Sequence, residues 1–280
     1  MNELSLLHGR DLVINKNISV KHFKLKEIEK INLDKYNIYL SMMIMSVLDV
    51  ADVLWCKEKI WYEDVKDWDF FIQRALAGNN NKTIAVEKGN RIVGIEKDCL
   101  FVNEEYKKVL NLFLGWNYDY IALNIKNESG TQTVLTTIKK DEKSNLYYIS
   151  EDTIKFTEHY YKLVVSFLKE INWIKHSYMF LKGGNKYAKK YILENNYKNR
   201  KYTNKETINL NSIVSALIAN GQPYFDIWEY PIYAVYDLYY RFVKINEYNN
   251  TMQAYLNGCI DTKSNPIKWD EINWASIIKK

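Results

Sequence analysis

The spacing of hydrophobic and polar positions changes several times along the chain, and each change predicts a new element. Residues 4–24 alternate in short bursts around a polar NKN turn, which predicts a small strand or hairpin unit. From residue 25 the spacing becomes helical, with a short amphipathic turn over 25–31 and a long apolar helix over 36–54. Another helix is expected to begin at Asp67, which can cap it, and to end at Gly78.

The middle of the chain mixes both periods. Residues 83–103 and 119–149 read as strands rich in β-forming residues, and 104–115 between them reads as a helix. We therefore predict an α+β fold that is helix-dominated, with a small N-terminal strand unit and a β-rich middle section. The expected divisions are an N-terminal strand unit plus helices, the mixed β-rich section and a C-terminal helical region, over residues 1–82, 83–150 and 151–280.

Helical periodicity returns in the second half. Ser150 is expected to cap an amphipathic helix, and further helices are predicted over 186–198, 210–219 and 232–248. A final short helix would hold Trp269 and Trp274. These two tryptophans give the C-terminal segment enough apolar area to be tied down, either on the chain's own helices or on a partner.

Composition directs attention to contact surfaces. Aromatic residues make up 15% of the 280 residues, and such side chains are enriched in packed interfaces as well as in cores. The net charge of +5 is a weak bias for a dedicated nucleic-acid binder. The three cysteines are scattered, so neither a disulfide framework nor a zinc site is indicated. No stretch reaches the roughly 18 to 20 apolar residues that a membrane span needs, and no membrane partner is expected.

Motifs of catalysis and cofactor binding are missing from the sequence, so we expect no catalytic, cofactor-binding or metal-binding residues. The four histidines lie far apart without ligand spacing. One acidic group stands at the start of a predicted helix. Carboxylates there can cap the free N–H groups of the first turn and are stabilised by the helix dipole. The alternative is a divalent-cation site in a metal-dependent phosphoryl-transfer enzyme. The group consists of Glu63, Asp64, Asp67 and Asp69.

The strongest charge feature is the basic segment 175–205, in which lysines alternate with tyrosines. Cationic side chains beside stacking rings suit a nucleic-acid groove, so nucleic-acid binding is one hypothesis. The other is an amphipathic helix whose lysines lie in water, with Tyr187, Tyr191 and Ile192 or Leu193 facing inward. Of these two hypotheses, we rank nucleic-acid binding second.

Aromatic residues cover nearly every face of the predicted helix 232–248, and a helix that is apolar all round must be covered. Together with the terminal tryptophans and the basic helix, it supplies the residues that we expect to contact a partner. They are Trp269, Asn273, Trp274, Tyr236, Tyr239, Tyr240, Lys186, Lys189 and Lys190.

Four stretches of the sequence, taken in order, resemble a family of proteins that tailed bacteriophages of low-GC Gram-positive hosts encode. They are HGRDLVINKNISVKHFKLKEIEKINLDKYNIYL, KIWYEDVKDWDFF, KGGNKYAKKYILENN and LNGCIDTKSNPIKWDEINW. Members of that family are virion morphogenesis proteins, described as structural or as tail assembly chaperone-like. No catalytic residue comes with the resemblance.

The resemblance implies a non-enzymatic structural or tail-assembly protein that works through protein–protein contacts. Its expected partners are other tail or virion proteins of the phage, with a homo-oligomer as a further possibility. Its expected location is the host cytoplasm during assembly and, if it is retained, the virion.

Overall fold

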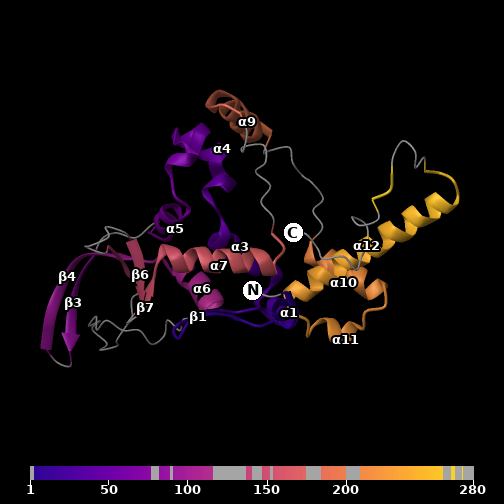
Figure 1. The fold of residues 1–280 in the computed structure, drawn as a ribbon. Helices are drawn as coiled ribbons and strands as arrows, with labels where there is room; N and C mark the ends of the chain where they lie inside the picture. Colours follow the sequence, from indigo (N-terminus) through magenta and orange to yellow (C-terminus); the bar gives the residue numbers. More distant parts are fainter. Residues whose placement is uncertain are drawn as a thin grey trace.

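Helices dominate the protein (Figure 1). The computed structural model describes residues 3–76, 82–88, 91–115, 137–140, 147–151, 154–174, 184–199, 209–260, 266–268 and 273. The predicted helix end at Gly78, the strands predicted over 119–136 and the terminal helix with both tryptophans lie outside these residues.

The N-terminal part begins with a helix, so the strand expected over its first residues is wrong. The hairpin that follows is confirmed: β1 and β2 pair antiparallel, with Leu12 opposite Val20. Asn15 closes the turn, because its side chain accepts the backbone N–H groups of Asn17 and Ile18 at 2.9 and 2.8 Å. The elements are α1 (Glu3–Leu7), β1 (Leu12–Asn15), β2 (Ile18–Val20), α2 (Leu25–Ile31) and α3 (Leu33–Ile44).

The long helix predicted over 36–54 is wrong, because the chain bends by 107° after α3. Ser46 starts a new turn, since its backbone N–H donates to Asp49 Oδ2 at 2.7 Å. Asp67 accepts the N–H of Val47 at 2.7 Å, and Arg74 donates to the carbonyl of Met42 at 3.1 Å. Side chains distant in sequence thus satisfy both ends of the break. The elements after it are η1 (Val47–Val50), α4 (Ala51–Val53), η2 (Leu54–Glu58), η3 (Tyr62–Asp64) and α5 (Asp67–Leu76).

The predicted α+β class with a β-rich middle section is corrected, because helices form most of the described structure. The strands of the middle pair in chain order as an antiparallel ladder, and Figure 1 shows β3 and β4 reaching away from the helices. Helix α6 (Glu104–Leu114) carries most of the buried residues described there, since its apolar positions face the core at helical spacing. The strands are β3 (Lys82–Lys88), β4 (Arg91–Phe101), β5 (Thr137–Lys140), β6 (Tyr147–Glu151) and β7 (Ile154–Phe156).

The helix expected to be capped by Ser150 begins later, at Glu158, with Thr157 as its N-cap residue. Ser150 belongs to strand β6, because backbone pairing across 147–156 continues the ladder. The helices predicted over 186–198 and 210–219 are confirmed, and the next one is longer than predicted. The helices are α7 (Glu158–Ile171), α9 (Lys186–Asn199), α10 (Leu210–Ala219), α11 (Tyr224–Ile227) and α12 (Ile232–Leu256).

The main core joins α3, α6, α7 and α12 with the β1–β2 hairpin. At its centre the rings of Phe23, Tyr36 and Phe113 contact one another, with centroids 5.6 to 6.0 Å apart. The buried hydroxyl of Tyr36 donates to Asn172 Oδ1 at 3.0 Å, so the one polar atom of that ring is satisfied. Elements from the first and last thirds of the chain therefore share one hydrophobic core.

A second, smaller core lies where α9 packs on the turns that follow the break (Figure 1). Leu193 is the one α9 residue buried in it among those described, and Trp61 and Tyr62 belong to the same cluster. No single helix of the described residues is long and apolar enough to cross a membrane. Leu33–Ile44 and Val47–Glu58 reach that length and composition only as a pair, across the 107° bend.

Candidate interaction surface

The C-terminal helices are fixed to the N-terminal part by backbone hydrogen bonds. The N–H groups of Leu25 and Lys26 donate to the carbonyls of Tyr230 and Trp228, each at 3.0 Å. The N–H of Ile232 donates to the carbonyl of Phe23 at 2.9 Å. Helices α2 and α12 both begin at this junction. The N–H groups in the first turn of each helix therefore donate to carbonyl groups of the segment that precedes the other helix.

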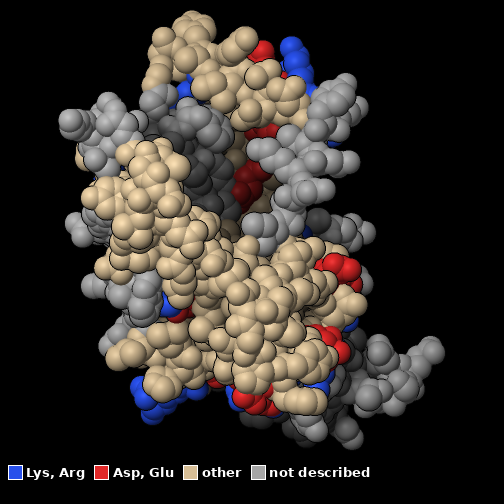
Figure 2. All heavy atoms as spheres, turned by 90° about the vertical axis from the view of Figure 1, so that its right-hand side faces the viewer, with Lys and Arg blue, Asp and Glu red and all other residues tan. Residues whose placement is uncertain are grey.

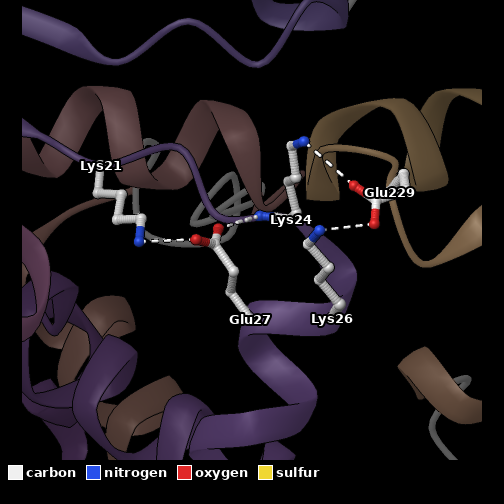
Figure 3. A network of polar contacts seen from close by, with 5 residues as sticks. All are labelled: Lys21, Lys24, Lys26, Glu27 and Glu229. Carbon is white, nitrogen blue, oxygen red and sulfur yellow. Dashed lines mark hydrogen bonds and ion pairs between the residues drawn. The ribbon is translucent and has the colours of Figure 1, made fainter.

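Ion pairs reinforce this junction (Figure 3). Glu229 accepts from Lys26 at 2.6 Å and from Lys24 at 3.2 Å, and these hydrogen bonds hold the pKa of its carboxyl below the usual value. Glu27 accepts from Lys21 at 2.8 Å and from the backbone N–H of Lys24 at 2.9 Å. The loop between α11 and α12 is therefore held in place.

Helix α11 presents aromatic rings to solvent beside that junction. Ile227 is fully buried and anchors the helix, whereas Tyr224 and Phe225 are 54% and 84% exposed. The Tyr224 ring lies 5.5 Å from the ring of Phe225 and 6.0 Å from that of Trp228. Exposed adjoining aromatic rings offer apolar contact area that the chain itself leaves uncovered.

The outer half of α12 also carries exposed apolar side chains. They and the two α11 rings form what we call the C-terminal apolar set: Tyr224, Phe225, Val243, Ile245, Tyr255 and Leu256. Figure 1 shows this half of α12 extending away from the other helices. Such side chains on a protruding helix are typical of protein contact sites.

Charge is sparse around the C-terminal apolar set. Only six of the 52 residues in 209–260 are charged, against 26% of the whole chain. Two of the charges neutralise each other where Arg241 donates to Asp237 at 2.8 Å. Figure 2 shows the side on which these helices lie, and uncharged residues cover most of the surface described there. Depletion of charge is the composition expected at the centre of a protein interface.

The tyrosines of helix 232–248 that we expected to contact a partner are more buried than residues of an exposed contact surface. Tyr236 and Tyr239 are partly buried against the main core, and burial raises the pKa of Tyr236. The ring of Tyr240 lies 5.4 Å from that of Trp173. The apolar residues that α12 exposes stand further along the helix, and the sequence alone gave no signal that separated the two groups.

The other terminal residues are described only in part. Asn273 is exposed, whereas Trp269 and Trp274 lie outside the described residues.

Lysines of the basic helix α9 contact other residues of the same chain. Lys189 donates to Glu63 Oε1 at 2.7 Å, and this bond is the chief reason why the pKa of Glu63 is lowered to about 2. The Nζ atom of Lys190 lies 4.2 Å from the ring centroid of Trp55, and that of Lys186 lies 5.1 Å from that of Trp61. These lysines therefore help to attach α9 to the turns beneath it.

The prediction that Tyr187 and Tyr191 of this helix face inward is wrong. Tyr187 and Tyr191 are exposed, and Leu193 faces inward as expected. Only 184–199 of the basic segment is described, so nucleic-acid binding through 175–205 stays a prediction.

Two members of the acidic group, Glu63 and Asp67, accept hydrogen bonds from neighbouring segments of the chain. Glu63 also accepts from Trp61 Nε1 at 3.1 Å and from the Tyr62 hydroxyl at 3.0 Å. Asp67, expected to cap its own helix, accepts instead from Val47 at the start of η1. Within the described residues, no three His, Cys, Asp or Glu side chains are grouped so that they could hold a metal ion.

Comparison with known proteins finds a similarity that covers the C-terminal helices. Residues 199–279, less than a third of the chain, match a family model described as the YomV second domain. YomV is a protein of a Bacillus phage region, so the match points to a phage origin and assigns no assembly role. No curated protein and no solved structure matches the chain. The matched stretch contains the whole C-terminal apolar set, which makes these helices the part of the chain that is similar to a phage-region protein.

Proposed function

We propose that the protein is a phage structural or tail-assembly component that acts through protein–protein contacts and without catalysis. The observation that carries the proposal is the C-terminal apolar set, exposed on charge-poor helices that coincide with the match to the YomV second domain. Its partners would be tail or virion proteins of the same phage. It would meet them in the host cytoplasm during assembly.

The hydrogen-bonded junction beside α11 suits contact through the aromatic rings of that helix. A partner that packs on α11 gains more when the rings are already positioned, because less side-chain and loop freedom is lost on binding. The hydrogen bonds between 23–26 and 228–232 supply that positioning. Phe225 and Leu256 are the most exposed members of the set, at 84% and 72%, and are the best anchors to test.

A co-purification from phage-infected cells tests the proposal. The phage would encode the tagged protein, either unchanged or with Phe225→Ser and Leu256→Ser together. We expect the unchanged protein to retain tail or virion proteins and the double variant to lose them about tenfold or more, since one interface anchor contributes about 1 to 2 kcal/mol. Tyr187→Ser is the matched control, because that ring is 82% exposed on α9.

Two results would refute the proposal. One is that no virion protein accompanies the unchanged protein. The other is equal recovery with the double variant, provided that both fold with the same thermal midpoint. Mass spectrometry of purified particles then separates the roles, because a structural component stays in the virion and an assembly factor does not.

A further inference from the structure

An open pocket of about 440 Å³ lies between the α2–α3 turn and helix α6, away from the C-terminal helices. Four of its nine lining residues are lysines: Lys30, Lys35, Lys107 and Lys108. Lys and Arg together account for only 39 of the 280 residues of the chain. This pocket therefore concentrates positive charge well beyond the average of the sequence.

The fold brings these lysines together from two separate elements. Asn32 has a φ of 76° and turns the chain sharply between α2 and α3, and its side chain accepts the N–H of Lys35 at 3.4 Å. The turn sets Lys30, near the end of α2, and Lys35, in the first turn of α3, at one rim of the pocket. Helix α6 supplies the other two lysines.

The carboxylates near the pocket do not balance its charge. Lys107, whose side chain is half-buried, pairs with the exposed Glu104, and Lys108 pairs with Glu105 at 2.6 Å. Pairs of this kind along one helix add little to stability. Glu104 is the one carboxylate among the lining residues. Among the described ion pairs, none involves Lys30 or Lys35. Ammonium groups gathered in one hollow repel one another, so an anion placed between them is favoured.

The pocket also has an apolar wall. Ile31, Tyr39 and Leu112 line it, and the Nζ atom of Lys35 lies 5.7 Å from the ring centroid of Tyr39. The ring of Tyr39 is mostly buried, so its position is fixed by the core. A ligand with an anionic end and a flat or apolar body would match both parts.

We propose that this lysine pocket binds a phosphate-bearing ligand of about mononucleotide size. Lysine binds phosphate as a mobile point charge, and several lysines can share the oxygens of one phosphate group. The volume falls within the usual range of about 300 to 1,000 Å³ for small-molecule sites. Free phosphate, a mononucleotide and the phosphorylated end of a nucleic-acid strand all present this chemistry. The inference does not depend on the proposed function of the C-terminal helices.

Calorimetric titration of the whole protein at low salt tests the proposal. The three probes are inorganic phosphate, adenosine monophosphate and a 5′-phosphorylated oligothymidine. We expect at least one to bind, with affinity that falls about tenfold in Lys30→Gln with Lys35→Gln and falls again as salt is added. Lys16→Gln with Lys57→Gln is the control, because both residues are exposed lysines outside the pocket.

The probes separate the sources of the phosphate. Equal binding of phosphate and the mononucleotide assigns the site to the phosphate group alone, and tighter binding of the mononucleotide assigns a role to the apolar wall. Binding of the oligonucleotide alone assigns a strand end. No binding of any probe below about 1 mM, or equal binding by the pocket variant and the unchanged protein, would overturn the proposal.

Discussion

Acidification should destabilise the protein through His22, a histidine buried in the main core. Its side chain is 3% exposed, and its ring packs edge-on against Phe167 with centroids 5.9 Å apart. Neither ring nitrogen has a hydrogen bond of standard geometry, although the carboxylate of Asp11 and the backbone of Arg10 favour the charged ring. Burial outweighs both and lowers the pKa of His22 from 6.5 to about 4.

The sign of the effect follows from the direction of that change. Between pH 6.5 and about 4 the unfolded chain binds a proton at His22 that the folded chain does not. The stabilising contribution is therefore complete above pH 6.5 and is lost as the pH falls toward 4. A change in pKa from 6.5 to about 4 corresponds to about 3 kcal/mol, of which about 2 kcal/mol should be lost between pH 7 and pH 4.5.

Urea unfolding across that pH range measures the effect. Carboxylates elsewhere in the chain also titrate, so the informative quantity is the difference between the unchanged protein and His22→Phe. We expect the free energy of unfolding of the variant to fall by about 2 kcal/mol less between pH 7 and pH 4.5. His8→Phe is the matched control, because His8 is exposed. Parallel pH curves for the unchanged protein and His22→Phe would refute the reasoning.

Two pairs of substitutions test the packing of the helices. Gly9 has a φ of 69°, and a Cβ atom there would lie 2.5 Å from Cγ of Pro231, whereas Gly115 has a φ of 66° with nothing within 4 Å of the added atom. By chemical denaturation, Gly115→Ala should cost about 1 kcal/mol and Gly9→Ala at least about 1 kcal/mol more, and equal costs would contradict the contact. Leu193→Ala should weaken the attachment of α9 by about 2 to 3 kcal/mol and speed proteolysis within that helix. Tyr187→Ala, at an 82% exposed position, should leave the cleavage rate unchanged, and a similar acceleration in both variants would argue against the buried leucine as the anchor.

Local periodicity predicted several helices well. The apolar spacing of 104–115 and 210–219 indicated helices that the structure contains, because each of these stretches has one apolar stripe and an asparagine that caps its start. The helix predicted over 186–198 is also present, although Leu193 is its one buried residue among those described. The same logic failed over 36–54, where the apolar pattern continues through the bend. Besides the local bond between Ser46 and Asp49, the bend is stabilised by Asp67 and Arg74, which no local pattern connects to it.

For the candidate interaction surface as well, the sequence predicted one part and tertiary packing decided the other. Scarcity of charge over 209–260 can be read directly from the sequence, and so can the aromatic residues that drew attention to helix 232–248. Which aromatic side chains remain exposed could not be predicted in this way. Tyr236 packs on the core and Phe225 faces solvent, because other segments of the chain cover one and not the other.

By itself, the sequence determined which stretches form most of the helices and which of them carry little charge. Only the tertiary structure decided how the charges are used: Lys189 pairs with Glu63, 126 positions away, while Lys30 and Lys35 line an open pocket. The physical reason is that helix formation depends on neighbours within a few residues. Burial, ion pairing and pocket shape depend instead on segments that are distant in sequence and meet only after the chain has folded.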